Sequence, residues 1–164
     1  MNLGGRWKDI HTPQMKPGGN PGADVYVLAE APGMDEDALG CPMVGLSGQY
    51  MREALYQVLG GHSVVEADPS WQQVCKYTNS LVRFNNVIRC HPKKNRDPHW
   101  EEVEACRNFI VEDIEQCRPN VILGMGNIPL RWMIGETGIL SWRGKTIPVQ
   151  VGTHACWYAQ LELE

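Results

Sequence analysis

Short apolar runs along the chain are separated by polar segments that contain glycine and proline. Two runs, residues 25–29 and 121–126, are too short for helices and are bounded by polar residues or glycine, as buried strands are. Residues 85–89 and 147–151 are weaker candidates for two further strands. The pattern therefore predicts four short strands spread over most of the chain.

Apolar residues with helical spacing lie between these strands. One expected helix begins near residue 99, and its apolar residues recur every three or four positions. They are Val103, Cys106, Ile110 and Ile114. Two more helices are expected over residues 49–59 and 129–134. Because strands alternate with helices, the chain is predicted to form a parallel α/β sheet.

Length and composition fit a single soluble domain. The chain has 164 residues, of which 43% are hydrophobic and 21% charged, and its mean hydropathy is −0.33. No apolar run reaches the length of a membrane span and the first residues lack a signal-peptide core, so we expect a cytoplasmic protein without membrane contact. Residues 1–23 are predicted to form an extended arm of one domain that covers residues 1–164.

The charge and the cysteines narrow the class of protein. The net charge is −4 and the isoelectric point lies near 5.7, which argues against a general nucleic-acid coat protein. A DNA enzyme stays open, because its basic residues need only line one face. The six cysteines are expected to be free thiols or metal ligands, since cytoplasmic chains of this size rarely carry disulfides.

The candidate chemistry lies where the first strand ends. Glu30 follows the run 25–29 directly, and Pro32 and Gly33 then force the backbone to turn. A carboxylate at the carboxyl end of a central strand occupies the place where open α/β sheets bind ligands. Asn86 offers a carbonyl and an amide together, which suits the edge of a pyrimidine. The alternatives are a capping or solvated acid at Glu30 and an ordinary turn asparagine at Asn86.

Five segments between residues 24 and 157 follow the order of one known family. The first joins Ala29-Glu-Ala-Pro-Gly33 to Gly40-x-Pro-x-Val-Gly45, and the second runs from Asn86 to Pro98 with the helix after it. The others are Arg118-Pro-Asn-Val-Ile-Leu-Gly-Met-Gly126, Arg143-Gly144 with Ile147-Pro-Val149, and Thr153-His154. Together they resemble the uracil-DNA glycosylase superfamily, and most of all its bacterial and archaeal family-4 branch. The resemblance implies a three-layer α/β/α fold around a central, mainly parallel four-stranded sheet.

The resemblance also implies a reaction and a set of site residues. A pyrimidine would be flipped out of DNA and its N-glycosidic bond hydrolysed. Glu30 would stabilise charge on the sugar or position the attacking water, and His154 would donate to the departing base. The expected base-binding residues are Asn86, Met43, Ala31, Gly33 and Glu36. For His154 the alternative is a structural histidine, and for Glu36, expected near the 5-carbon of the base, it is a solvated loop acid.

Contacts to DNA are expected from basic and aromatic residues. Met43 and Ala155 depart from the family, which has phenylalanine and proline at these positions. The expected DNA-binding residues are Lys93, Lys94, Arg96, Arg143, Trp157 and Tyr158, and the last two fall where relatives insert a wedge into the base stack. Ordinary surface charge and burial of the aromatic pair in the core are the alternatives.

The cysteines depart from the family-4 pattern. Family-4 enzymes hold a 4Fe–4S cluster with four cysteines, of which only Cys90 and Cys106 have counterparts here. Leu3 and Arg6 stand where the other pair is expected. Because such clusters are normally held by four protein ligands, we expect no cluster and no other metal or cofactor. A rearranged site is the less favoured alternative, and it would draw on Cys41, Cys75, Cys117 or Cys156.

The sequence thus predicts a monomeric DNA glycosylase. Its substrate is uracil or a bulkier modified pyrimidine; superfamily members that act on the modified bases of phage DNA suggest a role in antiviral defence for the second case. The alternative is a catalytically degenerate protein of the same fold that only binds DNA or a protein partner.

Overall fold

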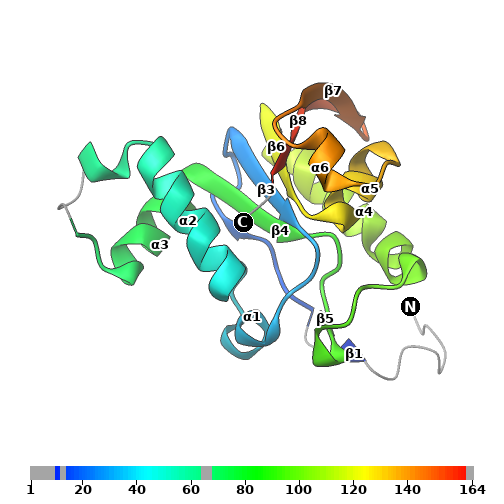
Figure 1. Cartoon of the computed structure of the whole chain (residues 1–164), viewed down its shortest axis with the longest axis horizontal. Helices are drawn as coiled ribbons and strands as arrows, with labels where there is room; N and C mark the ends of the chain where they lie inside the picture. The colour runs from blue at the N-terminus through cyan, green and yellow to red at the C-terminus, as the bar shows by residue number, and fades with distance from the viewer. Residues whose placement is uncertain (1–9, 12–13, 64–67, 162–164) are drawn as a thin grey trace.

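The computed structural model describes residues 10–11, 14–63 and 68–161, and its strands and helices alternate along the chain (Figure 1). The strands are β1 (Ile10–His11), β2 (Gly18–Gly19), β3 (Val25–Ala29), β4 (Val82–Asn86), β5 (His91–Pro92), β6 (Val121–Met125), β7 (Thr146–Val151) and β8 (His154–Leu161). The helices are α1 (Met34–Leu39), α2 (Leu46–Val58), α3 (Trp71–Leu81), α4 (Trp100–Cys117), α5 (Asn127–Ile134) and α6 (Ile139–Trp142). Two 3-10 turns are η2 (Gly61–Ser63) and η3 (Lys93–Asn95).

Six strands form one sheet in the order β2-β4-β3-β6-β8-β7. The inner strands β4, β3, β6 and β8 run parallel, and β2 and β7 pair antiparallel at the two edges. Tyr26, Val27 and Leu28 of β3 are fully buried, as expected for a parallel strand covered on both faces. The predicted α/β class with a mainly parallel sheet is confirmed, and the sheet has two more strands than the four predicted.

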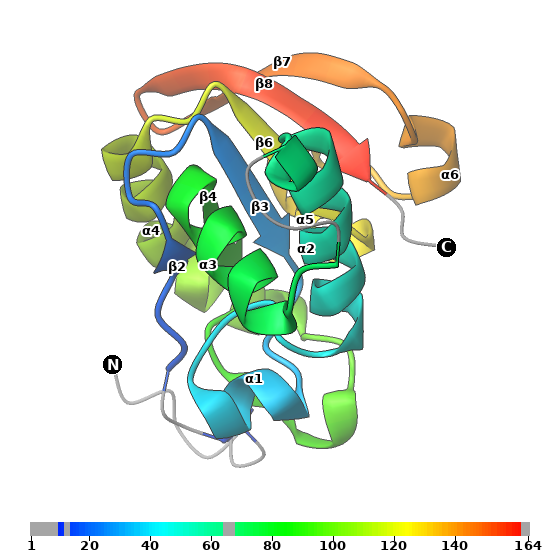
Figure 2. The same ribbon diagram turned by 90° about the vertical axis from the view of Figure 1, so that its left-hand side faces the viewer.

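Helices cover both faces of the sheet, so the fold has three layers (Figures 1 and 2). On one face, Met51 and Leu55 of α2 pack against Val27 of β3. On the other face, Ile110 of α4 and Leu130 of α5 belong to a second, larger core. The sheet is therefore held between two apolar cores, and its strand ends are left free for a site.

Most predicted elements lie close to their expected positions. β3 matches the run 25–29, and β6 lies within the run 121–126. Helix α4 begins at Trp100 and buries Val103 and Ile110, as its apolar spacing predicted. The strand expected at 85–89 lies instead at Val82–Asn86, because α3 ends at Leu81 and runs directly into it.

The main error in the predicted fold concerns the last strands. The strand expected at 147–151 is β7, an antiparallel edge strand, and the fourth parallel strand is β8, which the prediction missed. The two strands form a hairpin that turns at Gly152, whose backbone has a φ of 58°. The missed strand changes where His154 lies, as described below.

Residues 1–23 were predicted to form an arm, and part of it is described. There β1 pairs with β5 and β2 pairs with β4, so this part is attached to the domain by backbone hydrogen bonds. Within the described ranges, no helix is long and apolar enough to cross a membrane.

Candidate active site

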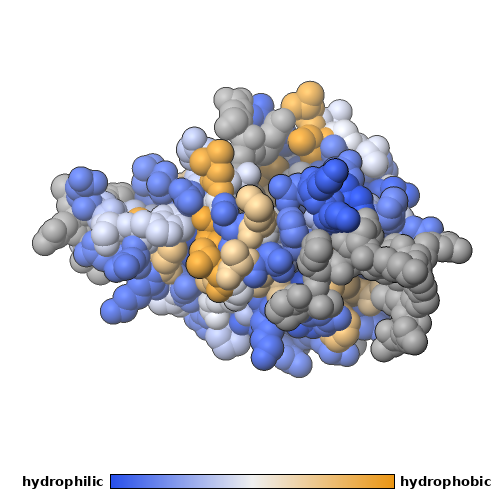
Figure 3. All heavy atoms as spheres, turned by 90° about the horizontal axis from the view of Figure 1, so that it is seen from below, coloured by the Kyte–Doolittle hydropathy of each residue, from blue (hydrophilic) through white to orange (hydrophobic). Residues whose placement is uncertain are grey.

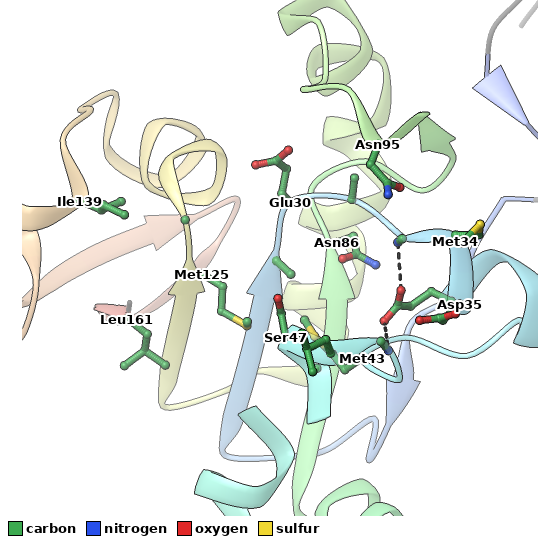
Figure 4. A pocket seen from close by; sticks show the side chains of 18 residues that line it. Glu30, Met34, Asp35, Met43, Ser47, Asn86, Asn95, Met125, Ile139 and Leu161 are labelled. Atoms are coloured by element: carbon green, nitrogen blue, oxygen red, sulfur yellow. Dashed lines mark hydrogen bonds between the residues drawn. The ribbon is translucent and has the colours of Figure 1, made fainter. Parts of the chain in front are cut away.

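A cavity of about 580 Å³ opens at the carboxyl ends of the parallel strands. Its walls come from the ends of β3, β4, β6 and β8, from the starts of α1 and α2, and from α6 (Figure 4). Figure 3 shows apolar side chains gathered among polar ones on the face seen from below. Met34 and Leu46, both 68% exposed, line the cavity and reach solvent. The cavity lies where open α/β sheets bind ligands.

Glu30 directly follows β3, and its side chain lines the cavity (Figure 4). Burial raises the pKa of the Glu30 carboxyl, and the nearby negative charge of Asp97 raises it further. No residue within the described ranges donates a hydrogen bond to this carboxylate. Glu30 is therefore a partly buried acid whose carboxylate accepts no hydrogen bond from the part of the chain that the structure describes.

Asn86 is the last residue of β4 and pairs in register with Ala29 of β3, next to Glu30. The side chain is only 3% exposed and lines the same cavity (Figure 4). Its amide has no hydrogen-bond partner among the residues that the structure describes. An amide has acceptor and donor groups side by side, so Asn86 is placed to bond a ligand that offers the complementary pair.

Glu36 also lines the cavity, but both of its carboxylate oxygens are engaged. Oε1 accepts hydrogen bonds from the backbone N–H groups of Val44 and Gly45, at 2.9 and 2.7 Å. Oε2 accepts one from the backbone N–H of Gly33 at 3.0 Å. The side chain is buried. Glu36 is therefore not a solvated loop acid, and it holds the loop between α1 and α2 in place; its expected position near the 5-carbon of a base stays a prediction.

Met43, Ala31 and Gly33 line the cavity, as the resemblance implied. Met43 is buried and has a φ of 59°, a left-handed conformation that is uncommon outside glycine and asparagine. Further residues line the cavity that were not among the predicted site residues: Asp35, Ser47, Asn95, Met125, Ile139 and Leu161. Met125 could have been found because it lies near the carboxyl end of a predicted strand; no periodicity marks Asn95 or Ile139.

The cavity lining is acidic. It contains Glu30, Asp35 and Glu36, and within the described ranges it contains no lysine, arginine or histidine. A site of this kind suits a neutral ligand with hydrogen-bonding groups better than a phosphate group.

The family model of the uracil DNA glycosylase superfamily matches residues 17–160. The chain belongs to this superfamily. A type-4 uracil-DNA glycosylase of Archaeoglobus fulgidus is 34% identical over 115 residues, which are 70% of this chain and 49% of the relative. Type-4 uracil-DNA glycosylases of Pyrobaculum aerophilum (35% identical, 70% of this chain, 50% of the relative) and Thermotoga maritima (30%, 79% and 59%) are also similar. The chain thus spans about half the length of the curated relatives it matches.

His154, predicted from the family resemblance to act on the base, does not line the cavity. His154 is the first residue of β8, which runs parallel to β6 and β3, so it lies at the amino ends of the strands, opposite Glu30. The ring is buried, and its Nε2 lies 2.7 Å from the carbonyl oxygen of Pro119. The expected placement beside Glu30 was therefore wrong, because Thr153-His154 begins a parallel strand rather than following one.

Trp157 and Tyr158 lie in the same strand and do not line the cavity. Trp157 pairs with Val121, the first residue of β6, and is 52% exposed. Tyr158 is buried in the core, where its hydroxyl donates to Oε1 of Gln160 and burial raises its pKa. The cavity lies at the carboxyl end of β8, and Trp157 and Tyr158 come earlier in the strand. The expectation that this pair wedges into DNA beside the flipped base was therefore wrong.

The predicted DNA-binding residues differ in surroundings. Lys93 and Lys94 are exposed in η3, next to Asn95 of the cavity. Arg96 is half-buried, and its guanidinium donates to both carboxylate oxygens of Glu102, at 2.9 and 2.7 Å. Arg143 is exposed at the end of α6. The two lysines are thus the best placed for phosphate contacts, whereas Arg96 is bound within the fold.

The described cysteines do not fit the 4Fe–4S cluster that the family-4 resemblance implies. Cys90 and Cys106 are half-buried; burial raises the pKa of each thiol, and the proximity of Cys106 also raises that of Cys90. The described part of the chain holds no group of three or more metal-ligating residues, and Leu3 and Arg6 lie outside it. Two thiols do not meet the four-ligand requirement of a 4Fe–4S cluster.

Proposed function

We propose that this superfamily member is a DNA glycosylase, which binds a pyrimidine flipped out of DNA in the cavity and hydrolyses its N-glycosidic bond. The observation that carries the proposal is the juxtaposition of Glu30 and Asn86. Neighbouring strand ends put a carboxylate and a buried amide, both without partners among the described residues, on one cavity. An enzyme that acts on a base must read its edge and act on its bond to the sugar, and these two groups can do both.

The proposed mechanism assigns one task to each group. The Asn86 carbonyl accepts a hydrogen bond from an N–H of the base, and its amide donates to the adjacent base carbonyl. The bond between the sugar C1′ and the base nitrogen breaks, and its electron pair leaves with the base. The Glu30 carboxylate stabilises the positive charge on the sugar and accepts the proton that the attacking water loses as its oxygen bonds to C1′. A raised pKa makes Glu30 a better proton acceptor.

Uracil is the first substrate we propose, because the curated relatives carry its name. A second class, pyrimidines with a bulky group at the 5-carbon, is favoured by the floor of the cavity. Met43 is a flexible, polarizable side chain rather than a flat aromatic platform, and such a surface adapts to larger ligands.

The test is base release from defined oligonucleotides. The protein would be incubated with single strands carrying one uracil, 5-hydroxymethylcytosine, its glucosylated form or thymine, and abasic sites would be revealed by alkaline cleavage. We expect release from at least one of the first three substrates, with thymine as the unmodified reference. Glu30→Gln should slow the single-turnover rate by roughly 10²–10³-fold, because it removes one preorganised charge. Glu53→Gln, exposed on α2, is the matched control and should keep the wild-type rate.

A non-enzymatic DNA-binding protein is the second candidate. It is favoured by the absence of histidine, lysine and arginine from the described cavity lining, since a departing base carries negative charge that a cation would stabilise. Binding to these oligonucleotides without release of any base would support this candidate. A wild-type rate in Glu30→Gln would instead retain the enzyme but remove Glu30 from the mechanism.

A further inference from the structure

The loop at the floor of the cavity holds a methionine in a strained conformation. Met43 has a φ of 59°, which costs free energy for a residue with a Cβ unless its surroundings enforce it. The first turn of α2 packs directly on this loop: a Cβ added to Gly48 would lie 2.4 Å from the carbonyl carbon of Met43. The backbone of Met43 is thus confined on the side of α2.

Arg52 of α2 holds the carbonyl groups of this loop. Its Nε donates to the Met43 oxygen at 2.7 Å, and its Nη2 donates to the Pro42 oxygen at 3.0 Å. Its Nη1 donates to the side chains of Thr78 and Asn79 on α3, at 2.7 and 2.9 Å. The guanidinium carbon also lies 4.1 Å from the centre of the Phe84 ring. A single side chain therefore ties the loop to α3 and to the sheet.

The charge of Arg52 makes this arrangement unusual. The side chain is fully buried, burial lowers its pKa, and no carboxylate is among its hydrogen-bond partners in the described residues. A buried cation without an acid partner is costly, so it needs well-placed dipoles around it. The dipoles are those of the loop: Arg52 binds its carbonyls, and the Glu36 carboxylate binds the N–H groups of Val44 and Gly45.

We propose that Arg52 is a positioning residue for the flipped base. Together with Glu36, it aligns the loop between two opposite buried charges and fixes Met43 in the left-handed conformation. This conformation places the Met43 side chain on the floor of the cavity (Figure 4). The inference rests on the proposed function, because it gives Arg52 a part in base binding through Met43.

The first test uses Arg52→Lys, which keeps the charge but loses the fork that spans two carbonyls. We expect the single-turnover rate on the accepted substrate to fall roughly 10–100-fold, as misplaced binding groups cause. Thr78→Val is the matched control, because it removes a partner on the opposite side of the same guanidinium and leaves the loop contacts intact. It should lower Tm and leave the rate unchanged.

A structural readout separates positioning from simple loss of stability. With ¹³C-methyl methionine, the Met43 signal can be assigned by its absence in Met43→Leu. Arg52→Lys should shift this signal and leave that of Met133, in the other core, in place. Thr78→Val should move neither. If Arg52→Lys does not fold, Arg52→Gln replaces it, because a neutral amide loses the fork without burying a charge.

A double-mutant cycle tests whether Arg52→Lys lowers the single-turnover rate through Met43. Glycine adopts a positive φ without strain, so Arg52→Lys should cost little further rate in a Met43→Gly background. An equal loss in both backgrounds, or an unmoved Met43 signal in Arg52→Lys, would overturn the proposal. Absence of base release by the wild-type protein would contradict the proposed function instead, and the methionine signals would still test the link between Arg52 and Met43.

Discussion

Asn85 and Asn86 are adjacent and identical in chemistry, but their side chains have opposite surroundings. Asn85 donates to the Tyr26 hydroxyl at 2.8 Å and to Asp113 at 3.1 Å in the core under α4. Asn86 lines the cavity. Successive side chains of a strand point to opposite faces, so the register of β4 decides which asparagine can bind a ligand.

The raised pKa of Glu30 gives a pH prediction. The proposed mechanism requires the carboxylate, so the single-turnover rate should fall as the pH drops through this raised pKa. Burial is the larger cause of the shift and the charge of Asp97 the smaller one. Asp97→Asn should therefore lower the pKa of Glu30 and move the acid limb of the pH–rate profile to lower pH. Single-stranded substrate avoids any effect of pH on base pairing.

The control for this prediction is Asp68→Asn, an exposed acid that does not line the cavity. It should leave the acid limb where the wild-type protein has it. An acid limb unmoved by Asp97→Asn would mean that Glu30 does not set the pH dependence.

Among the elements, β8 shows why part of the fold could not be predicted. Its buried positions are His154, Cys156, Tyr158 and Gln160, whereas Trp157 is exposed. Polar residues are therefore buried and an apolar one is exposed along this strand. The alternation of apolar and polar residues that usually indicates a strand is absent. β3 and β6 were predictable because parallel strands covered on both faces read as continuous apolar runs.

The turn η3 carries the prediction for DNA binding. Lys93 and Lys94 are exposed beside the cavity residue Asn95, so we expect them to contact phosphates of a strand whose base enters the cavity. Replacing both by alanine should weaken binding to single strands of any sequence. It should also reduce the slope of log Kobs against log salt by roughly 1.4, about 0.7 for each lost phosphate contact. Fluorescence anisotropy at several salt concentrations measures this slope.

Lys76→Ala is the control for the two lysines. Lys76 is exposed on α3 and does not line the cavity. An equal change of slope in Lys76→Ala would mean that binding follows overall charge and not the position of η3.

At the scale of the whole molecule, the family resemblance grouped Glu30 and Asn86 in one site, but the predicted strands did not. The strand predicted over residues 85–89 has Asn86 near its amino end, whereas β4 ends at Asn86, on the edge of the sheet where β3 also ends. The contacts of Arg52 were not predictable either. In the sequence it is an arginine within a helix of mixed polarity, where an exposed position is the ordinary expectation. Its burial follows from loops and helices that meet only in the folded chain.

The cysteine content leads to a prediction for the whole protein. Only two of the four positions expected to bind the cluster hold cysteine. We therefore expect purified protein to be colourless and free of iron. Iron analysis and a visible absorption spectrum of protein purified without oxygen test this. About four irons per chain with a broad visible band would contradict it and would require ligands from a rearranged site.

The acidic cavity has a consequence for metabolism. Free nucleotides contain the same bases as DNA, and each brings a phosphate dianion close to its base. Glu30, Asp35 and Glu36 repel that charge. A single nucleotide also lacks the neighbouring phosphates of a DNA strand, whose binding to Lys93 and Lys94 would offset this repulsion. The proposed activity should therefore spare the nucleotide pool and release bases only from the polymer.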